Sequence, residues 1–342
     1  MPSVPPHAEQ PGLWTLGHVL ALALMYHLKA LPSLGNAKGE VKRGAVAFAI
    51  DVLDFVRAKD LTYRVTIPLA GVHLAPSRKK PLRAGGAALR ALSGDEQGSY
   101  MDAWGIGRQN VFLNIPTVAL VIDVPTARMG QHPDPSATIS NWLCALYLQG
   151  YTLVGREARM ESHPSWISVG TSNIPLRMLE HITESKMLSP RDFEKVHATV
   201  EKLKKYNIGA PLSSKDYAVH RFYLGAARPS AADALVDFVV ALESLLLPYD
   251  SEARHGDLGY RFRLHGGHYL TEKKAERMQV FKQLKTLYEL RSALVHGGKF
   301  PKPSDIEEGR RMAMRLARIG VLRALETGFP RPEDFRVFLL GA

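Results

Sequence analysis

Hydrophobic residues follow two different periods along the 342-residue chain. From about residue 176 onward they recur at steps of three and four, which is typical of amphipathic helices. Earlier in the chain, residues 61–74 alternate and are rich in β-branched residues, and residues 110–125 form an apolar run, as strands do. We therefore predict an α+β protein, with a mixed α/β domain over residues 1–185 and an all-α helical bundle over residues 186–342.

Three helices are predicted within the mixed domain, over residues 13–31, 41–58 and 139–149. The first contains the apolar stretch 13–28, which at 16 residues is shorter than the roughly 20 residues that cross a bilayer. No basic cluster precedes this stretch and it lacks a small-residue cleavage site, so it is a poor match to a signal peptide. We interpret it as a buried helix and expect no stable membrane insertion, with membrane association as the alternative.

The predicted bundle contains five clear helices and a shorter or broken one, over residues 189–207, 215–226, 229–248, 271–296 and 304–326, with the broken one at 252–270. The helix over 229–248 is nearly all apolar, which predicts that it lies at the centre of the bundle. Glu243 interrupts its apolar run, and a buried acid needs a cationic or hydrogen-bonding partner. Arg261, Arg263 and Arg291 are the candidates for that partner.

The helix over residues 271–296 carries an arginine and a histidine near its end. Arg291 and His296 stand five residues apart, and Gly297 and Gly298 follow directly, as expected at a helix C-cap. The partial negative charge of a helix end favours a protonated imidazole. A permanent cation and a titratable group at one helix end can hold a phosphate and move protons around it. The same two residues also fit a surface cation and a capping donor.

The chain is strongly basic, with a net charge of +11 and a pI of about 9.6. Residues 251–342 hold 18 Lys and Arg against 11 Asp and Glu, so this stretch alone contributes +7. Such an excess favours polyanionic partners, nucleic acid first and acidic membrane second, although a solvated basic surface has the same composition. Within the stretch, we expect RNA phosphates to contact Lys299, Arg310, Arg311 and Arg315.

The remaining chemistry-bearing residues argue against other classes of site. A single cysteine, Cys144, excludes an intramolecular disulfide and fits a reducing compartment, and its apolar neighbours indicate a buried side chain. A metal hydrolase using His255, His265 and His268 is an alternative, but these histidines lack the spacing of a known metal motif. The glycines match neither a phosphate-binding loop nor a dinucleotide fingerprint, so we expect no cofactor and no metal.

Three segments together resemble a known family: ALESLLL, YRFRL and LYELRSALVHGG, followed by a basic helix. They resemble the Apea-like branch of the HEPN superfamily, over about residues 215–326. The signature of that superfamily is an arginine, four intervening residues and a histidine, which here is Arg291 to His296. The resemblance implies a helical bundle and, in many members, a metal-independent ribonuclease, whereas other members bind nucleotides or RNA without cleaving. The first 185 residues resemble no family.

The resemblance implies a metal-independent endoribonuclease that leaves a 2′,3′-cyclic phosphate. His296 would act as general base or acid, and Arg291 would bind the scissile phosphate. Glu243 would support the arginine, and Tyr288 and Ser292 would contribute hydrogen bonds. The alternative is a non-catalytic RNA- or nucleotide-binding module that senses a signal or dimerises.

The spacing of the Arg/His pair bears on oligomeric state. Five residues of helix rotate by about 140°, so Arg291 and His296 are not expected on one face of an intact helix. Either the glycines unwind the last turn, or a second copy supplies one of the two groups. Family members commonly dimerise around a shared site, so we expect a homodimer. By the same analogy we expect a cytoplasmic protein in a defence or toxin-like role, with the mixed domain as a place for an inhibitory or activating partner to act.

Overall fold

The computed structural model describes residues 49–50, 61–75, 80–103, 115–126, 134–153, 155–163, 172–176, 185–248, 258–297 and 300–340. The predicted helix over residues 13–31, most of that over 41–58, His255 and Lys299 lie outside these segments. In the segments that are described, no helix is both long enough and apolar enough to cross a bilayer. The predicted α+β class is confirmed there, because a six-stranded sheet occurs with nine helices.

The main sheet has the strand order β3-β4-β5-β1-β6-β7, and every neighbouring pair is antiparallel. Its strands are β1 (Leu61–Leu69), β3 (Leu82–Ala84), β4 (Ala87–Ala91), β5 (Val118–Thr126), β6 (Glu157–His163) and β7 (Ser172–Pro175). A separate parallel pair joins β2 (Val72–His73) to β8 (Lys186–Met187). The two strand regions expected from the hydrophobic pattern become the adjacent central strands β1 and β5.

Alternation along β1 explains how the sheet is oriented. Tyr63, Val65 and Ile67 are buried, whereas the residues between them are only partly buried, as expected for a strand with one covered face. Val65 is paired with Ile122 of β5, and both are almost fully buried. One residue earlier, the register pairs Arg64 with Asp123, which form an ion pair of 2.9 Å. Apolar pairs therefore face the core and the charged pair points away from it.

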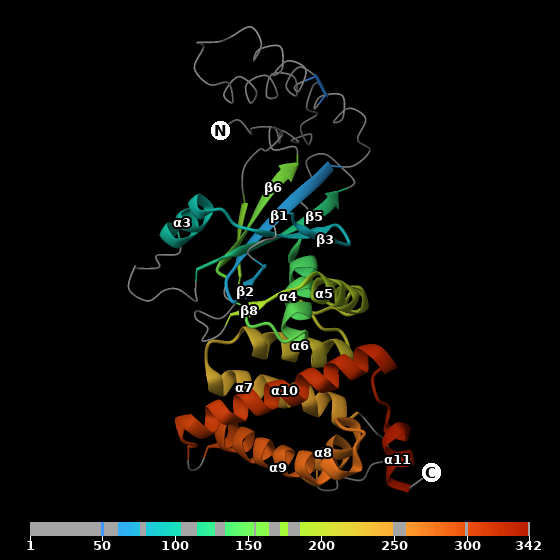
Figure 1. The fold of residues 1–342 in the computed structure, drawn as a ribbon. Helices are drawn as coiled ribbons and strands as arrows, with labels where there is room; N and C mark the ends of the chain where they lie inside the picture. The colour runs from blue at the N-terminus through green and yellow to red at the C-terminus, as the bar shows by residue number, and fades with distance from the viewer. Residues whose placement is uncertain are drawn as a thin grey trace, which may run out of the picture.

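Helices α4 (Ser136–Leu148) and α5 (Pro190–Leu203) lie between the main sheet and α6 (Ser214–Ala227) (Figure 1). Helix α4 is buried along residues 142–148 because α5, α6 and α10 (Pro303–Thr327) all contact it. Cys144 is fully buried and burial raises the pKa of its thiol, so the prediction of a buried cysteine is confirmed. Trp142 of α4 stacks on Phe193 of α5 at 5.6 Å. The buried core therefore continues across the domain boundary predicted at residues 185 and 186.

Every described element after β8 is a helix. These helices are α5, α6 (Ser214–Ala227), α7 (Ala231–Leu246), α8 (Leu258–Tyr269), α9 (Lys274–His296), α10 (Pro303–Thr327) and α11 (Pro332–Leu340), and α3 (Gly94–Ala103) lies beside the sheet. Ser189, Ser213 and Ser230 cap α5, α6 and α7. Each serine accepts a hydrogen bond from the backbone N–H three residues later, which satisfies a donor that the helix itself leaves free.

Helix α7 lies at the centre of the helical part, as its apolar sequence predicted. It contacts α6, α8, α9 and α10, and nine of its residues are buried. Gly309 lets α10 approach closely, because a Cβ there would lie 2.7 Å from side-chain atoms of both Leu235 in α7 and Leu290 in α9. This packing positions the C-terminal end of α9 beside α7 and α10.

Candidate active site at the end of α9

The end of α9 is set by a glycine. His296 is the last residue of the helix, and Gly297 takes a φ of 80°, in the left-handed region that side chains rarely adopt. The predicted glycine stop is therefore confirmed. His296 is exposed at this end, whereas Arg291, about one turn earlier, is partly buried.

Arg291 and His296 are neighbours within one chain. Nη1 of the arginine lies 3.5 Å from Nε2 of the histidine, although both residues belong to the same regular helix. The expectation that an intact helix would keep the two groups apart is wrong. The rotation of about 140° is bridged because the arginine side chain is long and reaches along the helix toward its end.

The contact constrains the proton on the imidazole. A guanidinium has only donors, so Nε2 of His296 can join this contact only as an acceptor. An imidazole that accepts at Nε2 carries its proton on Nδ1. At 3.5 Å the contact is long, so an arriving anion can displace it at little cost.

Glu243 is the acid that faces the pair. Its Oε2 lies 3.6 Å from Nη2 of Arg291, which joins the central helix α7 to α9. Of the three arginines considered as its partner, the structure places Arg291 there. Burial raises the pKa of the Glu243 carboxyl, and the positive charge of Arg291 only partly opposes that rise.

The guanidinium of Arg291 is not fully satisfied. Its Nε is buried and has no hydrogen-bond partner among the described residues, and 24% of the side chain is exposed. The nitrogens Nη1 and Nη2 meet His296 and Glu243 at 3.5 and 3.6 Å, both longer than a strong charge-assisted hydrogen bond. The group is held in place while keeping donor capacity for an oxyanion.

Tyr288 and Ser292 lie on α9 near the pair. The Tyr288 ring is partly buried, lies 6.0 Å from the Phe262 ring and packs against the core. Neither side chain makes a hydrogen bond to Arg291 or His296 in the part of the chain that the structure describes. Their predicted hydrogen-bonding roles stay predictions.

The three arginines predicted to bind RNA have different surroundings. Arg310 forms two hydrogen bonds with Glu307, of 2.6 and 3.0 Å, so its charge is largely compensated. Arg311 is 66% exposed and lies 3.8 Å from the same carboxylate. Arg315 is exposed and forms no ion pair with a described residue. Arg311 and Arg315 therefore remain the better candidates for phosphate contacts.

Of the histidines considered as metal ligands, His265 has a structural role. His265 is buried, donates from Nδ1 to the Leu246 carbonyl at 2.6 Å, and stacks on Phe335 at 4.1 Å. Burial lowers the pKa of both His265 and His268. Within the described segments, no three His, Cys, Asp or Glu side chains are grouped closely enough to hold a metal ion.

A feature that the sequence did not single out lies farther back on α9. A shallow depression of about 360 Å³ is lined by six residues of α9 and α10: Met278, Gln279, Lys282, Gln283, Thr286 and Met312. The available signal was a pair of glutamines four residues apart, which places two amides on one side of a helix.

Comparisons with family models, curated proteins and solved structures found no match to this chain.

Proposed function

We propose that the protein is a metal-independent endoribonuclease of the HEPN type, with Arg291 and His296 as its catalytic pair. The proposal combines the sequence resemblance with one observation, the direct contact of Arg291 Nη1 with His296 Nε2 at 3.5 Å. A permanent cation beside an accepting imidazole suits a reaction in which negative charge builds on a phosphate while a proton is removed nearby.

The reaction follows from these two groups. Nε2 of His296 takes the proton of a ribose 2′-hydroxyl, and the 2′-oxygen forms a bond to the adjacent phosphorus. The bond from phosphorus to the 5′-oxygen breaks, and that oxygen leaves with a proton as a 5′-hydroxyl. Arg291 donates hydrogen bonds to the non-bridging oxygens as their charge grows. The products are a 2′,3′-cyclic phosphate and a free 5′-hydroxyl.

Glu243 acts as a positioning residue in this scheme. Its carboxylate holds Arg291 from the side of α7, so the guanidinium stays beside the imidazole. The leaving oxygen takes its proton from an acid, which is either the imidazolium that His296 becomes on accepting the 2′-hydroxyl proton or a protonated imidazole of a second copy. A homodimer that faces two Arg/His pairs across one cleft would supply a second imidazole for that step, in keeping with the expected dimer.

The test is cleavage of labelled single-stranded RNA in the presence of EDTA. The full chain should release fragments that end in a 2′,3′-cyclic phosphate and should leave DNA of the same sequence intact. His296→Ala and Arg291→Ala should each lower the rate about 100-fold or more. His73→Ala and Arg331→Ala remove the same side-chain types from the sheet and from the start of α11, and should cleave normally. Undiminished cleavage by both His296→Ala and Arg291→Ala would contradict the assignment of these residues as the catalytic pair.

A binding function without cleavage is the second candidate. It is favoured by the Glu243 contact, which already occupies one edge of Arg291 and lowers the net charge offered to a phosphate. Salt-dependent RNA binding that produces no cyclic phosphate would support it. In either case we propose a cytoplasmic role in defence or toxicity, with the sheet-containing part of the chain exerting control through a partner.

A further inference from the structure

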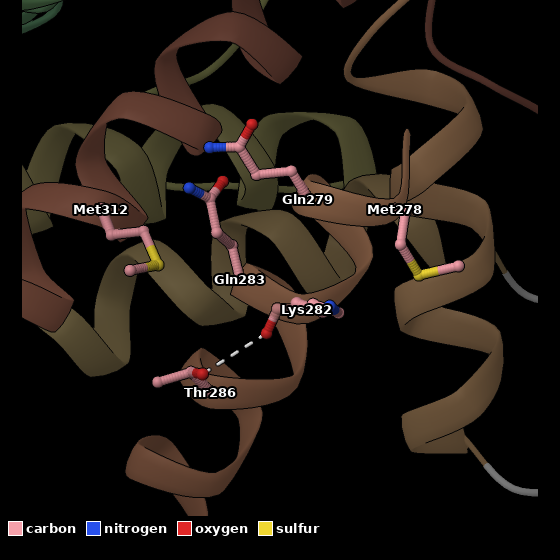
Figure 2. Close-up of a pocket in the computed structure, with 6 residues that line it drawn as sticks. All are labelled: Met278, Gln279, Lys282, Gln283, Thr286 and Met312. Carbon is pink, nitrogen blue, oxygen red and sulfur yellow. Dashed lines mark hydrogen bonds between the residues drawn. The ribbon is translucent and has the colours of Figure 1, made fainter. Parts of the chain in front are cut away.

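The depression on α9 and α10 presents two adjacent amide groups to solvent. Gln279 and Gln283 are one helical turn apart and extend from the same side of α9, with Met312 of α10 forming the opposite wall (Figure 2). Neither amide forms a hydrogen bond with any described residue. Two donor-acceptor groups are therefore left for a ligand that can bind both.

The rest of the lining suits a flat, polar-edged ligand. Met278, which is 62% exposed, and Met312 provide polarisable apolar surface. Thr286 bonds to the Lys282 carbonyl and so turns its hydroxyl back onto the helix. Lys282 is the only charged residue of the lining, and none of the six is acidic. A partner helix would bury both amides without partners, which costs free energy.

We propose that this depression binds a base of single-stranded RNA, with adenine preferred. Glutamine amides pair with the donor and acceptor edge of adenine, and single-stranded RNA exposes such edges. This inference rests on the proposed function, because the base would belong to the same RNA strand that is cleaved at the end of α9. Eight residues separate Gln283 from Arg291, which is about 12 Å of helix. A base in the depression therefore belongs to a nucleotide near the cleaved phosphate.

The test uses oligo(A) and oligo(C) whose riboses carry 2′-O-methyl groups, so that no 2′-hydroxyl can attack. Binding to the full chain is followed by fluorescence anisotropy. The wild type should bind oligo(A) about tenfold more tightly than oligo(C). The double variant Gln279→Met with Gln283→Met keeps side-chain length and helix preference but loses the amides, and it should bind both oligonucleotides alike. Lys285→Met, a charge change on the same helix, should weaken both equally.

Two outcomes would overturn the inference and they have different meanings. If the wild type binds both oligonucleotides equally, or if the double variant still prefers oligo(A), the depression does not bind adenine selectively. The proposed nuclease function is unaffected by that result. If the wild type binds neither oligonucleotide and cleaves no RNA, the proposed function fails and takes this inference with it. Circular dichroism of the double variant checks that α9 is intact.

Discussion

Oε2 of Glu243 lies 3.6 Å from Nη2 of Arg291, so an acid in the central helix is paired with the cation of the candidate active site. Burial disfavours the ionised form of this carboxyl and raises its pKa above the ordinary value. The folded protein therefore holds the Glu243 proton more tightly than the unfolded chain does. The contribution of this group to stability is complete below about pH 4.5 and is lost as the pH rises through its higher folded-state pKa.

Glu243→Gln should remove the loss of stability that accompanies ionisation of this buried carboxyl. Urea unfolding of the wild type and the variant at pH 4, 5.5 and 7 should show the wild type becoming less stable relative to the variant as the pH rises. Glu289→Gln, at an exposed position on α9, is the control and should show little change with pH. A wild-type-to-variant difference that stays constant over this range would contradict the assignment of Glu243 as a buried acid.

His265 should make the protein sensitive to mild acid. Burial lowers the pKa of this imidazole below its ordinary value, so the unfolded chain binds the proton first. Stability from this group is complete above about pH 6.5 and is lost as the pH falls through the lower folded-state pKa. Arg261 and His268 also oppose its protonation, and His268 titrates in the same direction.

His265→Asn keeps a donor near the Nδ1 position for the Leu246 carbonyl but cannot be protonated. It should lower stability by about 2 kcal/mol at pH 7.5, because the stacked contact with Phe335 is lost and a small cavity remains. Its unfolding free energy should then fall less steeply than that of the wild type between pH 7 and 5. The same slope in both proteins would show that another group causes the acid sensitivity.

Asp237 should be one of the most sensitive positions in the helical part. The residue is 2% exposed, and its carboxylate accepts hydrogen bonds from Arg221 and, at 2.9 Å, from Arg228. Asp237→Ala removes the shared partner of two cations and should cost about 3 kcal/mol, the low end for a broken buried pair, because both arginines can still reach water. Asp233→Ala, exposed one turn earlier in α7, should cost less than about 1 kcal/mol. Thermal unfolding of both variants decides the comparison.

Substitution of Gly225 by even the smallest side chain should be destabilising. A Cβ at this position of α6 would lie 2.9 Å from the Phe238 ring and 3.2 Å from the Ala234 carbonyl oxygen, and neither can move away freely. Gly225→Ala should therefore destabilise the protein by about 1–3 kcal/mol. Gly98→Ala in α3, where a Cβ meets nothing within 4 Å, should instead stabilise by up to about 1 kcal/mol. Equal effects at the two sites would contradict the close packing of α6 on α7.

Much of the local structure could be predicted because it depends on neighbours in sequence. Ser189 caps α5 and Gly297 ends α9 through contacts within a few residues, and the glycine stop was predicted. The apolar run of α7 required a central position whatever surrounded it. The separation of Arg291 and His296 was predicted incorrectly, because the rotation per residue of a helix does not include the length of the arginine side chain.

The sequence by itself determined the α+β class, the glycine stop behind His296, the buried cysteine and the need of Glu243 for a cationic or hydrogen-bonding partner. Only the tertiary structure decided that this partner is Arg291, because α9 packs against α7 and brings the two side chains together. It also decided that Arg310 is compensated by Glu307 and that two glutamines border a depression with Met312. Local patterns specify helices and their ends, whereas partners far apart in sequence depend on how those helices pack.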